Sequence, residues 1–338
     1  MVTMQNDDNI EYLSEKIRVC IKRRFGDDCE IADIELATLG GSNRTVLFDV
    51  VRGSYPLRLV LRQETVPSEY SPFLPSDMQY RVLEVVYEHG IPVPRPVFEL
   101  EPADNLGQGY VVTAVPGETL PKRLINSAEY VTMRARFLQQ SAEILAKLHT
   151  IDHVLVPGLS ALQESSDPLG AQIALYDRYG EPHPAIEFAF RYLAKYEPEH
   201  GAKNFLHGDF RNGNMIVGTE GIRVLLDWEC AHTGSVMEEI GWFCARSWRF
   251  GRVDLAAGGF GDRETFYKAY EKASGNLVDR ESSRWWEIFG VMRWAIYNIM
   301  QSHGHLSGER RSPAFAACGR NTGIIEYDLL KIIAKEFD

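Results

Sequence analysis

Residues 207–229 of this 338-residue chain read HGDFRNGNMIVGTEGIRVLLDWE, and they restrict the fold more than any other stretch. Two short apolar runs flank a polar, glycine-rich turn, Gly218-Thr219-Glu220-Gly221, and this pattern predicts a β-hairpin. Asp209 and Asn214 precede the hairpin on a tight loop, and Asp227 ends its second strand. We therefore expect two carboxylates and an amide to lie on one loop and at the end of the neighbouring strand.

These residue types, in this order, match the template for phosphoryl transfer. In a kinase-like site an Asp orients the acceptor hydroxyl, while an Asn and a second Asp hold magnesium between the β- and γ-phosphates. Carboxylate and amide oxygens are the ligands that Mg²⁺ requires. Asp209, Asn214 and Asp227 are therefore candidate catalytic residues, and Asn214 and Asp227 are candidate metal ligands. The alternative for Asp209 is a loop-capping aspartate, since Asp is common in turns.

The motifs HGDxxxxN and DWE together resemble those of the aminoglycoside phosphotransferase and choline kinase family, which has a protein-kinase-like fold. The later stretch GWFCARSWRFG, residues 241–251, is similar to the branch found as stand-alone bacterial enzymes and fused to acyl-CoA dehydrogenases. The resemblance covers about residues 25–300. It implies ATP as the phosphoryl donor, with GTP not excluded, Mg²⁺ as cofactor and a small hydroxylated molecule as acceptor. It also adds His207 to the catalytic loop, where a scaffold role is favoured over proton transfer.

The N-terminal part predicts a three-stranded antiparallel meander. Its strands read IADIELATL, RTVLFDVV and PLRLVLR, and short turns at Gly40-Gly41-Ser42-Asn43 and Arg52-Gly53-Ser54 join them. Because strand side chains alternate between faces, Arg62 shares a face with Val60 while Leu61 points to the other. Helical spacing then predicts a helix from Ser76 to His89, and GYVVTAVPG predicts a further strand.

The resemblance places the nucleotide-binding residues in this N-terminal part. The turn at Gly41 and Ser42 is similar to a phosphate-covering loop, although the same residues would also suit an ordinary hairpin. Arg62 stands where kinases place a phosphate-binding lysine, and its guanidinium can bind phosphate in a fork. The nucleotide-binding candidates are Gly41, Ser42, Asn43, Val60, Arg62, Gln79, Thr113, Ala114 and Val115.

Gln79 departs from the family pattern. Family members commonly read R-E-Y-x-V-L where this chain has Met78-Gln79-Tyr80-Arg81-Val82-Leu83, so the glutamate that pairs with the strand cation is an amide here. The Gln79 amide could still accept from Arg62, without the strength of an ion pair. Otherwise Glu69 or Glu84 takes its place, or the site is held more loosely.

The C-terminal part is mostly helical by its apolar spacing, with the clearest segments at roughly 128–150, 184–197, 264–274 and 281–303. The predicted fold class is α+β, and the resemblance implies a two-lobed, protein-kinase-like chain. We expect residues 1–115 to form an N-terminal nucleotide-binding lobe. Residues 116–338 are expected to form a helical lobe with the catalytic loop and the acceptor site.

The charge of the acceptor stays open. Glu229, Glu238 and Glu239 would suit a polyamine, whereas Arg211, Arg246 and Arg249 would suit an anion such as a hydroxy acid or its CoA ester. Structural roles compete with both, because Glu238 and Glu239 also suit the start of a helix. The acceptor-binding candidates are Arg211, Glu229, Arg246 and Arg249. Large aromatic residues late in the chain suit either an aromatic box for a quaternary ammonium or the core: Trp285, Trp286, Trp294 and Tyr297.

Composition excludes several classes of partner. A net charge of −11 and a pI of about 5.4 disfavour a nucleic-acid partner. The five cysteines are scattered, which argues against a disulfide framework and a zinc knuckle. No secretory signal is visible, and the apolar stretch around Arg293 is too short to span a membrane. We expect a cytoplasmic monomer or homodimer without a membrane partner.

The sequence thus predicts an ATP- and Mg²⁺-dependent enzyme that phosphorylates a hydroxyl of a small molecule. The acceptor classes are aminoglycoside-like, choline-like, and hydroxy acid or hydroxyacyl-CoA. The alternative, motivated by Gln79, is a catalytically weak nucleotide-binding regulatory protein of the same fold. A protein kinase is disfavoured because Asp227-Trp228-Glu229 stands in place of the D-F-G motif and no A-P-E motif follows.

Overall fold

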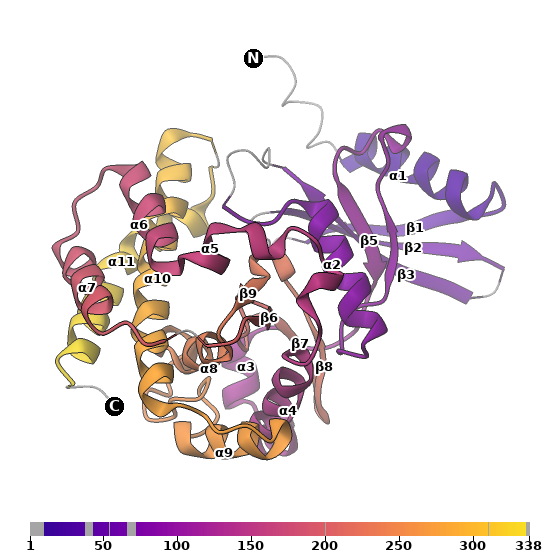
Figure 1. Ribbon diagram of the computed structural model, residues 1–338. Coiled ribbons are helices and arrows are strands. Elements are labelled where there is room, and N and C mark those ends of the chain that lie inside the picture. Colours follow the sequence, from indigo (N-terminus) through magenta and orange to yellow (C-terminus); the bar gives the residue numbers. More distant parts are fainter. Residues whose placement is uncertain are drawn as a thin grey trace. The chain divides into compact units, whose positions relative to one another are not determined.

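The computed structural model describes residues 10–37, 43–53, 55–65, 72–199, 201–309 and 311–335 (Figure 1). The chain divides into two compact units. The first comprises Met1–Pro116 together with Val224–Cys230, and the second comprises Gly117–Arg223 together with Ala231–Asp338. The fold is α+β, as predicted, but the return of residues 224–230 to the first unit was not anticipated from the sequence.

The first unit is built on a five-stranded antiparallel sheet with the strand order β1-β2-β3-β5-β4. The strands are β1 (Glu30–Leu36), β2 (Asn43–Arg52), β3 (Tyr55–Glu64), β4 (Pro96–Glu99) and β5 (Gly109–Thr113). The predicted meander is confirmed as β1, β2 and β3, and the predicted helix is α2 (Ser76–Glu88). Gly41 and Ser42, which stand between β1 and β2 in the sequence, lie outside the described residues.

Helix α1 (Ile10–Phe25), which was not predicted, covers one face of this sheet. Its buried residues Leu13, Ile17 and Ile21 join Leu59 and Leu61 of β3 in one hydrophobic core. Leu59 and Leu61 are buried while Val60 and Arg62 are partly exposed, so the predicted alternation of β3 is confirmed. Arg62 is therefore left on the face of β3 opposite this core.

The second unit is mostly helical (Figure 1). Its helices are α3 (Pro121–Asn126), α4 (Val131–Leu148), α5 (Gln163–Ser166), α6 (Pro168–Tyr179), α7 (Pro184–Lys195), α8 (Val236–Cys244), α9 (Arg263–Ser274), α10 (Arg280–Ser307) and α11 (Pro313–Ile333). The four predicted helical segments correspond to α4, α7, α9 and α10. The predicted hairpin is the pair β7 (Met215–Gly218) and β8 (Gly221–Leu225), and β6 (Asn204–Leu206) pairs with β9 (His232–Gly234). None of the described helices has the length and apolar character that a membrane span requires.

The core of the second unit is rich in aromatic side chains. Trp285 and Trp286 of α10 are buried, and the Trp285 indole N–H donates to the Leu193 carbonyl oxygen at 3.0 Å. These two residues are therefore core residues, and the alternative of an aromatic box is wrong for them.

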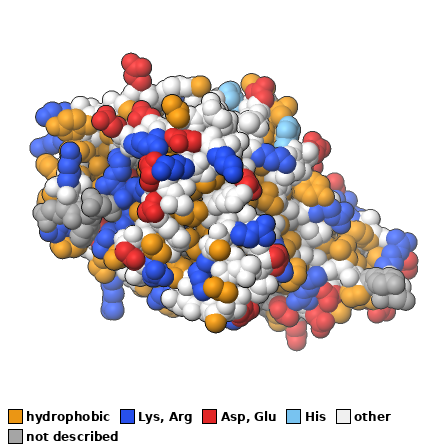
Figure 2. Space-filling model, turned by 90° about the horizontal axis from the view of Figure 1, so that it is seen from below, with side chains coloured by type: hydrophobic (Ala, Val, Ile, Leu, Met, Phe, Trp, Pro, Cys, Tyr) orange, Lys and Arg blue, Asp and Glu red, His pale blue; other side chains and the backbone are white. Residues whose placement is uncertain are grey.

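Charged side chains of both signs are mixed on the face drawn in Figure 2. Basic side chains there are interrupted by acidic and uncharged ones and form no continuous stripe.

Candidate active site

The loop from His207 to Asn214 starts where strand β6 ends, and helix α8 holds its first peptide groups. The buried Glu239 carboxylate accepts the backbone N–H groups of His207 and Gly208 through one oxygen, each at 3.0 Å. Its second oxygen lies 2.9 Å from Nε2 of His149. Gly208 has φ = 78°, which glycine adopts without steric cost. The loop therefore leaves β6 in a fixed direction.

The Asp209 carboxylate is held by three side-chain donors. Oδ1 accepts from Arg211 Nε at 3.0 Å and from Trp242 Nε1 at 2.9 Å, and Oδ2 accepts from Asn214 Nδ2 at 2.6 Å. The Asp209 side chain remains 19% exposed. A carboxylate oriented by several donors and still open to solvent suits an acid that must align a substrate hydroxyl.

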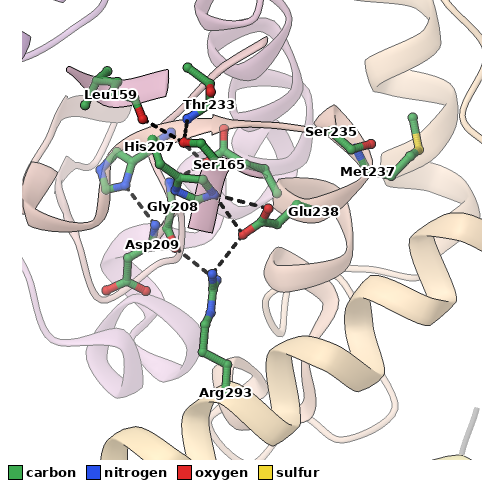
Figure 3. Close-up of polar contacts among 12 residues, drawn as sticks. Leu159, Ser165, His207, Gly208, Asp209, Thr233, Ser235, Met237, Glu238 and Arg293 are labelled. Carbon is green, nitrogen blue, oxygen red and sulfur yellow. Dashed lines mark hydrogen bonds and ion pairs between the residues drawn. The ribbon is translucent and has the colours of Figure 1, made fainter. Parts of the chain in front are cut away.

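His207 lies beneath this loop and is fully buried. Its Nδ1 accepts the backbone N–H of Asp209 at 3.2 Å (Figure 3). Its ring packs edge-on against Phe210. An imidazole buried in this way fixes the turn on which Asp209 sits. These contacts favour the scaffold role.

The orientation of Asn214 fits a magnesium ligand. Its amide nitrogen donates to the backbone oxygen of Asp209 at 3.1 Å and to the Asp209 carboxylate. The amide oxygen is therefore the atom left for a cation, and oxygen is the ligand that Mg²⁺ requires. Among the described residues no group of three or more His, Cys, Asp or Glu side chains could hold a metal ion. Magnesium shared with substrate phosphates needs only one or two protein ligands, so a single Asp and an Asn suffice.

In the first unit, Arg62 pairs with Asp227. The guanidinium Nη2 lies 2.5 Å from Oδ1 of Asp227, and Nη1 lies 3.5 Å from Oγ1 of Thr45. Asp227 follows β8 and has φ = 58°, a left-handed conformation that Asp tolerates better than most residues. Burial would lower the pKa of Arg62, but Asp227, Tyr110 and Glu229 outweigh it and the pKa is raised. Arg62 is therefore a permanent cation beside a carboxylate.

The expectation that the Gln79 amide accepts from Arg62 is wrong. Gln79 is buried, its amide nitrogen donates to the Leu74 carbonyl oxygen at 2.7 Å, and its amide oxygen accepts from the Tyr110 hydroxyl at 3.3 Å. Tyr110 stands opposite Arg62 in the register of β3 and β5. Of the two glutamates proposed as substitutes, Glu84 is exposed and Glu69 lies outside the described residues. The carboxylate beside Arg62 is instead Asp227.

Residues 33–286, most of the chain, match the profile of the phosphotransferase enzyme family. The chain belongs to this family. Its curated relatives in this family include mouse acyl-CoA dehydrogenase family member 10, which is 24% identical over 204 residues, 56% of this chain and 19% of that protein. A probable acyl-CoA dehydrogenase of Arabidopsis thaliana is 27% identical over 327 residues, 86% of this chain and 38% of that protein. The chain thus spans about a fifth of the mouse relative's length.

Solved structures of similar fold include aminoglycoside phosphotransferases and a choline/ethanolamine kinase family protein. A putative aminoglycoside phosphotransferase from Ralstonia eutropha has a TM-score of 0.72 at 20% identity, with 96% of this chain and 99% of that chain covered. A choline/ethanolamine kinase family protein from Mesorhizobium loti has a TM-score of 0.61 at 13% identity, with 95% of each chain covered. The streptomycin-ATP-APH(2")-IIa ternary complex has a TM-score of 0.57 at 14% identity, covering 85% and 89%. The predicted kinase-like fold is confirmed.

The remaining nucleotide-site candidates of this phosphotransferase lie on or beside the sheet. Asn43 begins β2 opposite Glu64, and Val60 pairs with Val112 of β5. Thr113 ends β5, and Ala114 and Val115 follow the strand. The Ala114 N–H donates to the Arg58 carbonyl oxygen at 2.9 Å. A nucleotide base that meets this segment would therefore use other backbone groups.

Two of the arginines proposed for the acceptor are engaged with acids of the second unit. Arg249 is buried and donates to Glu287 at 3.0 Å, and burial lowers its pKa. The prediction of Arg249 as an acceptor ligand is therefore wrong, because the side chain belongs to the core. Arg246 pairs with Asp328 at 2.9 Å and is partly exposed.

The remaining acceptor candidates are Arg211, which belongs to the catalytic loop, and Glu229. Arg211 stacks over the Trp248 ring at 4.6 Å while it bonds Asp209, so it stays a candidate. Glu229 is partly exposed, and its carbonyl oxygen accepts the Leu74 N–H at 2.8 Å.

The acids of α8 also have structural roles. Glu238 and Glu239 lie in the first turn of α8, so the alternative role at the start of a helix is confirmed. Both side chains are buried. Glu238 pairs with Arg293 at 2.8 Å. The argument for a polyamine acceptor therefore loses these two residues and keeps only Glu229.

Sequence reasoning missed Trp242, Arg293 and Tyr110. Trp242 lies in the stretch GWFCARSWRFG, which was noted only for the resemblance. Arg293 was noted only as a charge inside an apolar run. A charged residue within such a run needs a partner in the interior, and that signal could have identified it.

Proposed function

We propose that this chain transfers the γ-phosphoryl group of ATP to a hydroxyl group of a small molecule, with Mg²⁺ as cofactor. The observation that carries the proposal is the Asp209 carboxylate, which three donors orient and solvent still reaches. Membership in the phosphotransferase enzyme family supports phosphoryl transfer. ATP as donor is supported by the ATP complex of a protein with similar fold.

Each residue has a part in the proposed mechanism. Asp209 would align the acceptor hydroxyl and accept its proton as the oxygen attacks the γ-phosphorus, while ADP leaves. Arg62 would neutralise phosphate charge. Asn214 and Asp227 would hold Mg²⁺, which supplies further charge neutralisation on the β- and γ-phosphates. The first unit would serve as the nucleotide-binding lobe, and the second would carry the catalytic loop and the acceptor site.

The proposal requires Arg62 to exchange partners. Its guanidinium bonds the carboxylate that is proposed to hold Mg²⁺. In the mechanism Arg62 would release Asp227 and bind phosphate oxygens, and Asp227 would then be available as a ligand of Mg²⁺. Nucleotide and Mg²⁺ should therefore bind together, because each compensates one half of the broken ion pair.

The same pair motivates the second candidate, a catalytically weak nucleotide-binding regulatory protein. Gln79 leaves Arg62 without an acid from α2, so Asp227 serves as its counter-charge. A nucleotide-binding protein in which this pair never opens would bind without turnover.

Release of ADP from Mg²⁺-ATP tests the proposal. The acceptor panel should contain aminoglycosides, choline and ethanolamine, hydroxy acids and hydroxyacyl-CoA esters, with GTP as the alternative donor. Asp209→Ala should reduce ADP release to near background without a change in unfolding temperature. Asp254→Ala removes an exposed aspartate of the second unit and is the matched control, with wild-type turnover expected. Wild-type turnover in Asp209→Ala would remove Asp209 from the mechanism, and nucleotide binding without ADP release for every acceptor would favour the regulatory protein.

A further inference from the structure

Trp242 is the one donor to the Asp209 carboxylate that comes from a helix and not from the catalytic loop. Its indole N–H donates to Oδ1 at 2.9 Å, and the side chain is buried. The other two donors, Arg211 and Asn214, belong to the same loop as Asp209 and move with it. The Trp242 hydrogen bond therefore ties the carboxylate to helix α8.

A glycine of helix α10, Gly290, leaves room for the Trp242 ring. A methyl group at Gly290 would lie 2.8 Å from Cε3 of Trp242, closer than van der Waals contact allows, so a larger residue would displace the indole. Gly241, next to Trp242 in α8, would likewise bring a Cβ within 2.6 Å of the Ser283 carbonyl oxygen. Two glycines thus allow α8 and α10 to approach closely around this indole.

Arg293 of α10 lies over the Trp242 ring and also holds the loop. Its guanidinium carbon is 4.3 Å from the ring centroid, a cation–π contact. Nη2 donates to the Gly208 carbonyl oxygen at 3.1 Å, and Nη1 donates to Glu238 at 2.8 Å (Figure 3). Gly208 directly precedes Asp209. Arg293 therefore fixes both the peptide that carries Asp209 and the ring that bonds its carboxylate.

Glu238 keeps this buried arginine paired. Burial would raise the pKa of Glu238, but His232 and Arg293 outweigh it and the pKa is lowered. His232 lies in β9, which helix α5 anchors. The Thr233 N–H donates to Ser165 Oγ of α5, and Ser165 in turn donates to the Leu159 carbonyl oxygen (Figure 3). Buried ion pairs of this kind seldom stabilise more than apolar residues of the same volume would. Precise placement of groups is a better explanation for this one.

We infer that Trp242, held in place by Arg293, is a positioning residue that fixes the Asp209 carboxylate for phosphoryl transfer. The inference rests on the proposed function. It assigns Trp242 no contact with either substrate, because its N–H is used by Asp209. Loss of the N–H should therefore slow the chemical step and leave nucleotide binding intact.

Trp248 offers a matched control. It is buried like Trp242, and the two rings lie tilted against each other with centroids 5.0 Å apart. Its indole N–H is buried and has no hydrogen-bond partner within the described residues. Trp242→Phe and Trp248→Phe thus remove the same atoms from neighbouring sites, and only the first removes a hydrogen bond to Asp209.

The experiment measures kcat and the KM for Mg²⁺-ATP by ADP release, together with the unfolding temperature of each variant. Trp242→Phe should lower kcat about 10- to 100-fold, the usual value of a hydrogen bond to a charged group, with KM within about twofold of wild type. Phe in place of Trp248 keeps an aromatic ring beside Arg211, so Trp248→Phe should keep kcat within about twofold. Arg293→Lys, which keeps the charge beside Glu238 but lacks the planar fork, should fall between wild type and Trp242→Phe.

Measurement of Asp209→Ala alongside Trp242→Phe separates a failure of the positioning role from a failure of the proposed function. If Asp209→Ala is inactive and Trp242→Phe keeps full kcat, the positioning role is wrong. Equal losses in Trp242→Phe and Trp248→Phe would also overturn it, because packing alone would then explain them. If Asp209→Ala keeps wild-type turnover, or the wild type releases no ADP with any acceptor, the proposed function itself fails and the inference fails with it.

Discussion

Replacement of an acidic side chain by Gln79 changes how charge is balanced around Arg62. The expected ion pair to α2 is absent, and the Gln79 amide is instead satisfied by Leu74 and by the Tyr110 hydroxyl. Burial, Asp227 and Glu229 raise the pKa of Tyr110 to about 12 although Arg62 opposes them, so the phenol is neutral and can donate. Gln79 thus ties helix α2 to its surroundings by neutral hydrogen bonds, and Asp227 is the carboxylate that pairs with Arg62.

A double-mutant cycle between Tyr110 and Gln79 tests this neutral link. Tyr110→Phe leaves the buried Gln79 oxygen without its donor and should cost about 1–3 kcal/mol in the free energy of unfolding. Once Gln79→Met has removed that oxygen, the same Tyr110→Phe change should cost clearly less, with a coupling of about 1 kcal/mol. Urea unfolding of the four proteins measures both quantities. Additive costs within about 0.3 kcal/mol would show that the two side chains do not interact.

Among the elements of the first unit, α1 is attached to the sheet by charge as well as by its apolar face. Asp104, in the 3₁₀ turn Pro102–Asp104, has a buried side chain that accepts from Arg23 and from Arg24, each at 2.7 Å. Burial would raise the pKa of Asp104, but Arg24, the Glu101 N–H and Arg23 outweigh it and lower the pKa to about 2. The attachment of α1 therefore depends on an ionised carboxylate.

The attachment should depend on pH in a defined direction. Because the pKa is lowered in the folded state, the contribution of Asp104 is fully present above the unfolded pKa of about 4 and is lost as pH falls toward 2. It amounts to about 2 kcal/mol. The difference in unfolding free energy between wild type and Asp104→Asn should be constant from pH 5 to 7 and shrink below about pH 4. Urea unfolding at several pH values measures it, and a difference independent of pH would contradict the ion pairs.

In the second unit, one carboxylate of α10 neutralises arginines from three elements. Glu287 is fully buried and bonds Arg249 of the 3₁₀ turn Arg246–Arg249, Arg263 of α9 and Arg284 of α10. Glu287→Gln would leave buried guanidinium groups without a counter-charge and should cost about 3–5 kcal/mol of unfolding free energy. Arg284→Met removes the most exposed of the three arginines and should cost about 1 kcal/mol or less. Equal midpoints of urea unfolding for the two variants would contradict this account.

The elements themselves were largely predictable, because each has a local signal. Alternation identified β3, helical spacing identified α2 and α10, and a glycine-rich turn identified the hairpin of β7 and β8. The burial of Arg249 was not predictable, since its partner Glu287 is far away in the sequence. The Arg62–Asp227 pair and the Trp242 hydrogen bond were not predictable for the same reason. A motif identifies residue types, but it does not identify their partners.

At the scale of the whole molecule, the residues assigned to the reaction are distributed over both units. Asp227 and Arg62 belong to the first, whereas Asp209 and Asn214 belong to the second. Asp227 belongs to the first unit because residues 224–230 return there. The assignments of Asn214 and of Asp227 as metal ligands are therefore best tested residue by residue.

Binding of Mg²⁺-ATP to single variants tests these assignments without any need for turnover. Asn214→Ala and Asp227→Ala remove one oxygen ligand each and should both raise the Kd for Mg²⁺-ATP by about tenfold or more, because Mg²⁺ tolerates loss of a ligand poorly. Asp209→Ala should leave this Kd within about threefold, since Asp209 is assigned to the acceptor hydroxyl. Calorimetry with Mg²⁺-ATP, and with ATP and EDTA as the control, measures the three values. In EDTA the Asn214→Ala and wild-type affinities should converge, because the cation that Asn214 serves is gone. A loss confined to Asp227→Ala would mean that Asn214 contributes no ligand to the cation, and its assignment as a metal ligand would then be wrong.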